Sequence, residues 1–251
     1  MSGKVWIVGA GPGDPGLITV RGLEALRAAD VVLYDRLVAP ELLAECRPDA
    51  ELVYVGKEAE GRHTPQPEIT EALIAAARAG KDVVRLKGGD PYLFAHGGEE
   101  AVAVAAAGLA FQVVPGVTSA FAVPAAAGIP LSHRDLSSSI AIVTAHRAGD
   151  GDLPWQSLAG MDTVVVLMGA ARIREVCRRL VAAGRDPDEP AAAIYRGTTA
   201  RQREVFAPLA GLADAFVVAD LGAPSVIVVG AVVGLAGTIR TAELVSAGEG
   251  G

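Results

Sequence analysis

The stretch Val83-Val84-Arg85-Leu86-Lys87-Gly88-Gly89-Asp90-Pro91-Tyr92-Leu93-Phe94 indicates how the chain folds, because a β-branched run stops abruptly at two glycines, an aspartate and a proline. Residues 83–86 are typical of a buried parallel strand, and the glycines let the backbone turn sharply and lie close to a ligand. Pro91 cannot continue a strand, so Asp90 is expected at the carboxyl end, where open α/β sheets bind ligands. A tight turn with a solvated aspartate is the alternative interpretation.

The composition limits the class of protein. The chain has 251 residues, of which 51% are apolar and 20% charged, enough to bury one large core or two ordinary ones. Its formal net charge of −7 argues against general nucleic-acid binding, which requires a basic face. We find no targeting segment and no run of about 18 apolar residues that would span a bilayer, so we expect no membrane partner.

The two cysteines, Cys46 and Cys177, lie far apart in the sequence and lack the spacing of metal ligands. Reduced, buried thiols are the usual form of such cysteines inside cells. We therefore expect a cytoplasmic protein without a metal site.

The first half of the chain is typical of a doubly wound α/β domain. Five strand signals occur at residues 5–8, 31–34, 51–55, 83–86 and 111–114. Helical segments separate them, one over residues 19–29 with Thr19 as its cap, one that contains Pro67 and stops at Gly80, and an alanine-rich one that ends at Gly108. Strands alternating with helices predict a parallel sheet, which we assign to a domain of residues 1–115.

The first strand ends in a glycine-rich loop, Gly9-Ala10-Gly11-Pro12-Gly13-Asp14-Pro15-Gly16. The register of Gly11, Gly13 and Gly16 matches the dinucleotide-binding fingerprint. Pro12 and Pro15 remove two of the backbone N–H donors that a pyrophosphate would use. The loop therefore predicts a ligand site but disfavours a nicotinamide or flavin cofactor.

A second series of strands predicts a second α/β domain, which we assign to residues 116–245. Its signals lie at residues 140–144, 163–168 and 191–195, near Val205, and at 226–229. A helix over residues 172–183 separates two of them, and its arginines are expected on a solvated face. Met168 ends one of these strands, and a core position is the alternative to a ligand contact there.

Charged side chains follow the predicted strands at the ligand edge. Asp35 and Arg36 follow the second strand, and a surface ion pair between them is the alternative to a functional role. His96 lies between two glycine-rich loops, which makes it a candidate for ligand chemistry, with an ordinary surface or hydrogen-bonded histidine as the alternative. Glu99 and Glu100 fall in the first turn of the next helix, where they complement its dipole without any chemistry.

Taken together, these loops resemble one family. The motifs are VGAGPGDPGLITVRG at residues 8–22, ADVVLYDRLV at 29–38, VVRLKGGDPYLFAHGGEE at 83–100, VVPGVTSA at 113–120 and GIPLSHRD at 128–135. Over nearly its whole length the chain resembles the tetrapyrrole methylases. Its motifs are most similar to those of the members that C-methylate uroporphyrinogen III.

The resemblance implies a first domain with a five-stranded parallel sheet and a second with a mixed sheet, usually assembled as a homodimer. It also implies S-adenosyl-methionine as cofactor, S-adenosyl-homocysteine as product, and a site in the cleft between the domains, with the tetrapyrrole on the side of the first. The family's cofactor-contacting positions match Pro12, Gly88, Gly89, Asp90, Thr118, Ser119 and Met168, with backbone contacts near Gly197 and Ser225. A sulfonium ligand needs no anion cradle, so prolines in the first loop are tolerable.

The implied reaction is two successive methylations of uroporphyrinogen III to precorrin-2, which leads to sirohaem or cobalamin. The family's substrate-meeting positions match Arg36, Arg134, His146 and Glu99, and we add Asp35 and Met168 as candidate substrate contacts. Arginines suit the acetate and propionate groups of this substrate, because a guanidinium holds a carboxylate through two hydrogen bonds. The arginines would form a local basic region on an otherwise acidic protein.

One departure from the family pattern concerns the chemistry. The uroporphyrinogen enzymes usually have Phe-Gly-Arg-Gly-Gly-Glu-Glu where this chain has Phe94-Ala95-His96-Gly97-Gly98-Glu99-Glu100. An arginine is a good clamp and a poor base, whereas a neutral imidazole accepts a proton near neutral pH. We therefore take His96, Glu99 and Arg36 as the candidate catalytic residues.

Two alternatives to this function stay open at this stage. One is a later methyltransferase of the same fold that acts on precorrin-3B or precorrin-4. The other is a ligand-binding protein that has kept the fold and lost the chemistry. Measurable methyl transfer would exclude the second.

Overall fold

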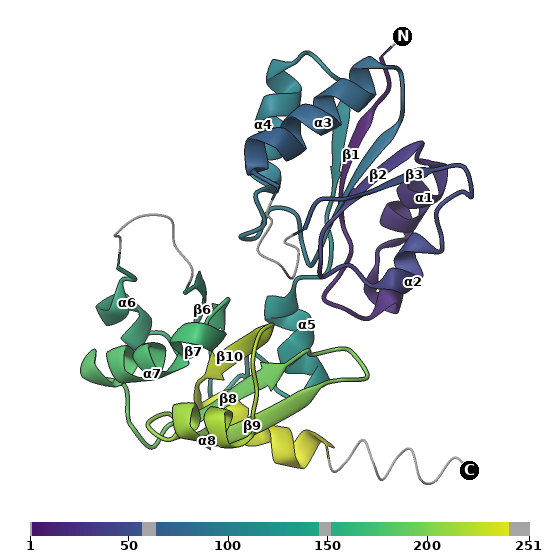
Figure 1. Ribbon diagram of the computed structural model, residues 1–251. Helices are drawn as coiled ribbons and strands as arrows, with labels where there is room; N and C mark the ends of the chain where they lie inside the picture. Colours follow the sequence, from purple (N-terminus) through teal and green to yellow (C-terminus); the bar gives the residue numbers. More distant parts are fainter. Residues whose placement is uncertain (1, 57–63, 146–151, 241–251) are drawn as a thin grey trace, which may run out of the picture. The chain divides into compact units, whose positions relative to one another are not determined.

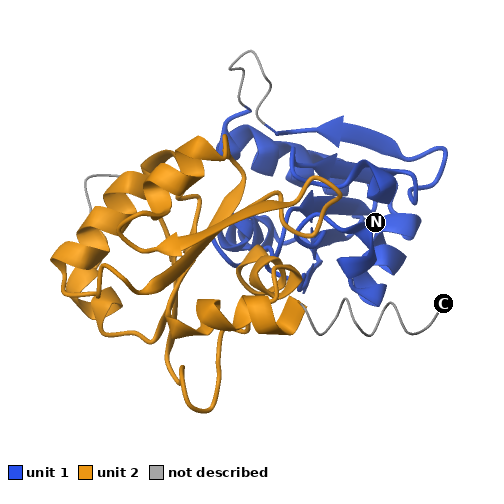
Figure 2. Cartoon of the chain, turned by 90° about the horizontal axis from the view of Figure 1, so that it is seen from below, with its two compact units in different colours: residues 1–118 blue, residues 119–251 orange. Residues whose placement is uncertain are grey.

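The computed structural model describes residues 2–56, 64–145 and 152–240, which fall into two compact units (Figure 2). Unit 1 comprises residues 1–118 and unit 2 comprises residues 119–251. Each unit has its own five-stranded sheet, packed on its own buried hydrophobic clusters.

Unit 1 is built on a parallel sheet, as the strand signals predicted. Its strands are β1 (Val5–Gly9), β2 (Val31–Tyr34), β3 (Glu51–Tyr54), β4 (Val83–Lys87) and β5 (Phe111–Val114). They lie in the order β3-β2-β4-β1-β5, and each neighbouring pair is parallel. The central strands β1 and β4 are buried almost throughout, which explains their runs of β-branched residues.

Helices cover both faces of this sheet (Figure 1). They are α1 (Val20–Ala28), α2 (Pro40–Leu43), α3 (Gln66–Arg78) and α4 (Gly97–Ala106). Helices α1 and α2 pack against Val8 and Val32, whereas α3 and α4 pack against Ile7 and Leu33 on the opposite face. Because side chains alternate along a strand, β1 and β2 contribute to both cores. Thr19 caps α1 as expected, its Oγ1 accepting a hydrogen bond from the Gly22 N–H at 3.1 Å.

The loops that follow β1 and β4 leave the sheet towards opposite faces. Strand β1 leads into α1 on one face, whereas its neighbour β4 leads into α4 on the other. In open α/β sheets such a divergence at the carboxyl ends of two adjacent strands opens a crevice for ligands. The two glycine-rich segments, residues 9–16 and 88–91, are these loops.

Unit 2 contains the mixed sheet that the family resemblance implied. Its strands are β6 (Ile140–Thr144), β7 (Thr163–Leu167), β8 (Pro190–Tyr195), β9 (Arg203–Pro208) and β10 (Ser225–Val229). They lie in the order β6-β7-β10-β8-β9. Strands β6 and β7 are parallel, and the other neighbouring pairs are antiparallel. The predicted fold class is therefore confirmed for both units.

Four helices and two short 3₁₀ segments complete the described part of unit 2. They are α5 (Ser119–Ala126), α6 (Trp155–Ala159), α7 (Ile173–Ala182), α8 (Leu212–Val218), η2 (Ala170–Arg172) and η3 (Ala231–Leu235). Helix α7 buries Ile173, Val176, Cys177 and Leu180 on one stripe. Arg174 and Arg178 are exposed as predicted, whereas Arg179 is partly buried. Unit 1 also has one short 3₁₀ segment, η1 (Pro15–Leu17).

Both cysteines are free thiols, Cys177 buried and Cys46 half-buried. Burial raises the pKa of the Cys177 thiol to about 11 and also raises the pKa of Cys46, with a smaller contribution from the neighbouring Glu45. Neither thiol is therefore an activated nucleophile. Among the helices of the described ranges, none combines the length and apolar character that crossing a membrane requires.

Asp162 fastens the loops that begin β6 and β7. Its Oδ2 accepts hydrogen bonds from the backbone N–H groups of Ser138 and Ser139, at 2.8 and 2.9 Å, and from both of their hydroxyls. These bonds, led by the Ser138 N–H, lower the pKa of Asp162 from 3.8 to about 2. The carboxylate therefore stabilises the folded state above its unfolded pKa, and this stabilisation is lost as the pH falls through the folded value.

We predict that Asp162→Asn lowers the free energy of unfolding at pH 7, because an amide is a weaker acceptor for these four donors. The difference from the wild type should shrink as the pH falls from about 3.8 towards 2. Urea unfolding of both proteins across this range measures it. A difference that does not change with pH would contradict the assignment.

Candidate functional site

The three strands β1, β4 and β5 end in backbones that touch one another. A Cβ added to Gly116 would lie 2.3 Å from the Gly89 carbonyl oxygen and 2.7 Å from the Gly9 Cα. A Cβ added to Gly9 would lie 2.6 Å from the same oxygen. Gly11 and Gly89 also exchange backbone hydrogen bonds, at 2.6 and 3.3 Å. Only glycine permits this approach, so the loops form a tight backbone surface that Gly9, Gly89 and Gly116 keep free of side chains.

Asp90 ties two of these loops together. Its Oδ1 accepts a hydrogen bond from the Tyr92 N–H at 2.8 Å, and its Oδ2 accepts one from the Gly116 N–H at 3.0 Å. The first bond closes the tight turn that the sequence offered as an alternative. The second fixes the loop after β5 to the loop after β4. Asp90 therefore orders the glycine surface with both carboxylate oxygens.

The loop after β1 uses its own polar groups internally. Pro12 lies between Gly11 and Gly13, whose positive φ angles of 81° and 148° only glycine adopts readily. The Asp14 Oδ1 accepts a hydrogen bond from the Gly16 N–H at 2.8 Å. With that donor occupied and the Gly22 N–H capped by Thr19, the loop lacks the open amide cradle that a pyrophosphate needs.

The segment that joins β4 to α4 is strained. Phe94 and His96 have φ angles of 53° and 60°, a left-handed conformation that is uncommon outside glycine and is found preferentially at functional sites. The Tyr92 and Phe94 side chains are 58% and 42% exposed. Large apolar side chains held outward beside a glycine surface are typical of a ligand site.

His96 and Glu99 form an exposed pair at the start of α4. The His96 Nδ1 lies 3.1 Å from the Glu99 Oε1, and the two side chains are 66% and 68% exposed. The pKa of the Glu99 carboxyl is lowered, mainly by a hydrogen bond from its own backbone N–H and then by the hydrogen bond with His96. Because both side chains are exposed, a ligand can reach them. An exposed ion pair of this kind adds little to stability.

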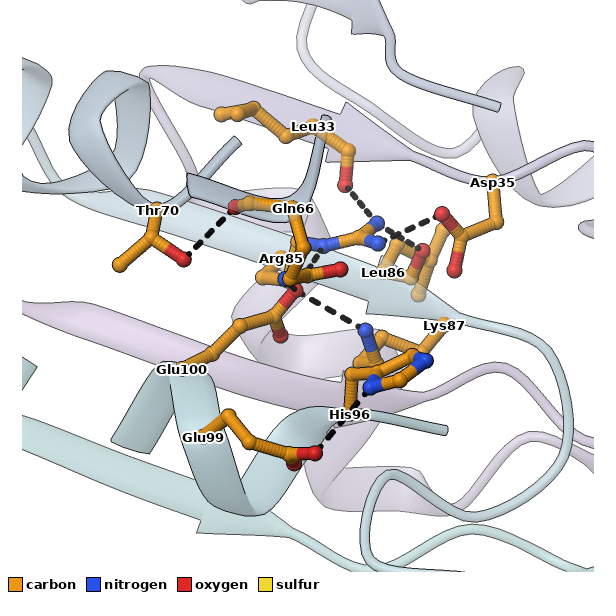
Figure 3. Close-up of polar contacts among 10 residues, drawn as sticks. All are labelled: Leu33, Asp35, Gln66, Thr70, Arg85, Leu86, Lys87, His96, Glu99 and Glu100. Carbon is orange, nitrogen blue, oxygen red and sulfur yellow. Dashed lines mark hydrogen bonds and ion pairs between the residues drawn. The ribbon is translucent and has the colours of Figure 1, made fainter. Parts of the chain in front are cut away.

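Beneath these loops lies a buried cluster of charged side chains (Figure 3). The Glu100 Oε1 accepts hydrogen bonds from the Arg85 Nε at 3.0 Å, the Lys87 Nζ at 3.0 Å and the Gln66 Nε2 at 2.8 Å. The Arg85 and Lys87 side chains are 2% exposed, and Glu100 is fully buried. Burial and then the charge of Arg85 lower the pKa of Lys87, whereas Glu100 acts in the opposite direction.

Asp35 connects this cluster to the surface. Its Oδ1 lies 2.5 Å from the Arg85 Nη2, and its side chain is 30% exposed. The alternative of a surface pair between Asp35 and Arg36 is therefore wrong, because the partner of Asp35 is a buried arginine on the neighbouring strand. Arg36 is exposed.

The cluster residues Arg85, Lys87 and Glu100 were not predicted as a site from the sequence. The signal was present, because Arg85 and Lys87 alternate within an otherwise apolar strand and must share one face of it. Glu100 stands on the same helical stripe as the buried Val104. Attributing Glu100 to the helix dipole alone overlooked that stripe.

The candidate residues of unit 2 gather at one edge of its sheet. Met168 follows β7, Gly197 follows β8, and Ser225 begins β10, which is antiparallel to both strands. Met168 has a φ of 53° and is 49% exposed, so the alternative of a core position is wrong. A Cβ on Gly197 would lie 2.4 Å from the Cγ1 of Val123 in α5.

The remaining candidate residues lie at exposed or partly exposed positions, apart from one outside the described ranges. Arg134 is exposed at the tip of a loop, Thr118 and Ser119 are partly exposed, and His146 lies outside the described residues. A groove of about 610 Å³, lined by Pro190, Phe206, Val233 and Arg240 among others, lies at the opposite edge of the second sheet. It contains none of the candidate residues.

Comparison with known proteins finds similar sequences and similar solved structures. The family described as Tetrapyrrole (Corrin/Porphyrin) Methylases matches residues 4–213. The Siroheme synthase of Stutzerimonas stutzeri is 48% identical over 235 residues, which cover 93% of this chain and 50% of that protein. The chain thus spans about half the length of the curated relatives that it matches.

Solved structures match over nearly their full length. The Uroporphyrin III C-methyl transferase of Thermus thermophilus is 43% identical with a TM-score of 0.80, covering 92% of this chain and 99% of that one. A structure of the same Thermus enzyme, 42% identical, is complexed with S-adenyl homocysteine. A cobalt precorrin-4 methyltransferase is 33% identical with a TM-score of 0.82, covering 92% and 95%.

We predict that Gly116→Ala weakens S-adenosyl-homocysteine binding by tenfold or more and lowers the free energy of unfolding by about 1–3 kcal/mol, because its Cβ would overlap two backbone segments. Titration calorimetry and urea unfolding measure the two effects.

Gly98→Ala is the matched control, because no heavy atom lies within 4 Å of the added Cβ in the first turn of α4. It should leave binding unchanged and stabilise the chain by up to about 1 kcal/mol. Equal binding by the two variants would contradict a ligand role for the glycine surface.

Proposed function

Because the chain belongs to the tetrapyrrole methylase family, we propose that it is an S-adenosyl-methionine-dependent methyltransferase that C-methylates uroporphyrinogen III twice, giving precorrin-2 and S-adenosyl-homocysteine. The observation that carries the proposal is the 43% identity over 99% of the Thermus enzyme. The five sequence motifs that led to the family all lie within the matched region. The proposal covers methyl transfer only, since the curated relatives are about twice as long.

The glycine surface of unit 1 fits the proposed cofactor. When bound, S-adenosyl-methionine supplies an electrophilic methyl group on a sulfonium centre. Backbone carbonyls and small residues suit a cation that must be approached closely, and Gly9, Gly89 and Gly116 provide them. We assign the contacts to Pro12, Gly88, Gly89, Asp90, Thr118 and Ser119, and in unit 2 to Met168, Gly197 and Ser225.

The substrate carries acetate and propionate groups around its ring, and we assign them to exposed cations. Arg36 and Arg134 are exposed and can each hold a carboxylate with two hydrogen bonds. Lysine would lack that geometry. His146 and Met168 are assigned to the same substrate by the family resemblance.

The chain must also manage protons, because methylation of a pyrrole carbon ends with the loss of a proton from the ring system. His96 and Glu99 are exposed and adjacent, so one can accept a proton while the other stabilises the resulting charge. Arg36, beside Asp35, contributes positive charge at the reacting ring. The Asp35 carboxylate is suited to accept hydrogen bonds from pyrrole N–H groups.

A second candidate function is methylation of a later corrin precursor. The observation that favours it is the match to the cobalt precorrin-4 methyltransferase, at 33% identity and a TM-score of 0.82. The lower identity ranks it behind uroporphyrinogen III. Offering both substrates in parallel assays separates the two functions.

We also propose that the chain forms a homodimer in the cytoplasm. The dimer follows from the family resemblance, and light scattering should give twice the mass of the chain. The compartment follows from the two free cysteines, neither of which is paired in the described structure.

The central test is anaerobic incubation of the pure protein with S-adenosyl-methionine and enzymatically made uroporphyrinogen III. We expect a chlorin-like absorption spectrum and the mass of two added methyl groups. If the cofactor binds but no methylated product forms, the substrate assignment is wrong.

For His96 we predict that alanine reduces turnover by about 100-fold while S-adenosyl-homocysteine affinity changes little, since the imidazole acts on protons rather than on the cofactor. His96→Arg restores the residue that is usual in the family. It distinguishes a residue that binds substrate carboxylates from one that accepts a proton. Turnover and calorimetric affinity that fall together in His96→Ala would rule out this role.

A further inference from the structure

Arg85 makes contacts in several directions, a set that a lysine side chain could not make together. Its Nε donates to the Glu100 Oε1 at 3.0 Å, and its Nη2 donates to the Asp35 Oδ1 at 2.5 Å. Its Nη1 donates to the carbonyl oxygens of Leu33 and Leu86, at 3.4 and 3.3 Å. The planar guanidinium is thereby fixed on three sides, and it holds the Asp35 carboxylate in one orientation (Figure 3).

Asp35 is the member of the cluster that reaches solvent. Its side chain is 30% exposed, whereas Arg85 and Lys87 are 2% exposed and Glu100 is fully buried. Its backbone N–H donates to the Leu86 carbonyl at 3.3 Å, which continues the pairing of β2 with β4. The ion pair with Arg85 uses Oδ1, which leaves Oδ2 as the second acceptor atom of this partly exposed carboxylate.

Stability alone does not account for this arrangement. A buried ion pair rarely stabilises a protein more than well-packed apolar side chains of the same volume would. The Glu100 Oε2 is also buried without a partner among the described residues, a further cost of keeping charge in this core. Polar networks kept against such a cost are expected at functional positions.

Unit 2 contains an arginine in a comparable buried setting, which serves as the control. Arg185 is 3% exposed and bonds to both oxygens of Glu189, at 2.6 Å each. It also donates to the carbonyl oxygens of Leu158 and Met161. Its acidic partner is four residues away in sequence and lies outside the candidate site. Arg85 instead joins partners 15 and 50 residues away.

We propose that Arg85 is a positioning residue for the tetrapyrrole, because it locks the Asp35 carboxylate so that Oδ2 accepts an N–H group of a substrate pyrrole ring. Glu100 braces Arg85 from the interior. The inference rests on the proposed function, since the pyrrole N–H groups belong to its substrate. It assigns Arg85 no contact with substrate or cofactor.

The first experiment compares Arg85→Lys with Arg185→Lys in the full chain. Lysine keeps the charge but cannot engage Asp35, Glu100 and the two carbonyls together. We expect Arg85→Lys to lower kcat/KM for uroporphyrinogen III by about 10–100-fold, as small misplacements do, with S-adenosyl-homocysteine affinity unchanged. Arg185→Lys should reduce the urea midpoint comparably and leave kcat/KM unchanged. Equal kinetic losses in both variants would overturn the proposal.

The second experiment is a double-mutant cycle between Arg85→Lys and Asp35→Asn. If Arg85 acts through Asp35, adding Arg85→Lys to Asp35→Asn costs less than about threefold further. Fully additive losses would overturn the proposal and leave Arg85 a structural residue. Should Arg85→Lys fail to fold, Glu100→Gln replaces it in the same cycle, because it loosens Arg85 from behind. A wild-type chain that makes no methylated product defeats the proposed function itself, a result distinct from an additive cycle.

Discussion

The contact between backbones at the ends of β1, β4 and β5 is the constraint on which the site of unit 1 depends. Gly9, Gly89 and Gly116 approach so closely that a single Cβ on Gly116 would overlap a carbonyl oxygen at 2.3 Å. This contact is possible because β1 lies between β4 and β5 in a parallel sheet, with all three carboxyl ends at one edge. Asp90 then holds two of the loops together through the Gly116 N–H. A ligand there would meet main chain rather than side chains.

The same strand end combines this neutral surface with charge. Strand β4 has alternating faces, so Leu86 enters an apolar core while Arg85 and Lys87 point towards α3 and α4 and meet Glu100. Among the described members of the cluster, Asp35 is the one that reaches solvent. In the proposed methyltransferase, the loop after β4 would thus offer backbone to the cofactor, while Arg85 on β4 would fix the Asp35 carboxylate for the tetrapyrrole.

Much of the fold could be predicted from the sequence, because the strands are short apolar runs that stop at glycine, proline or charge. The ten strand signals all correspond to strands, including the weak one near Val205. Helix α8 was not predicted, because it has only seven residues and its N-cap, Gly211, offers no side chain as a start signal. Side-chain partners were harder, since the pair of Asp35 with Arg85 spans 50 residues and the adjacent Arg36 suggested a local pair. The candidate ligand contacts were predicted from the family resemblance, because burial and periodicity do not show which ligand a residue binds.

The most direct test of this account is a crystal structure of the protein with S-adenosyl-homocysteine. We expect its electron density against the loops of residues 9–13 and 88–90, with Gly9, Gly89 and Gly116 unmoved and Asp35 still paired with Arg85. Density confined to another part of the chain, such as the groove lined by Pro190 and Phe206, would contradict the account.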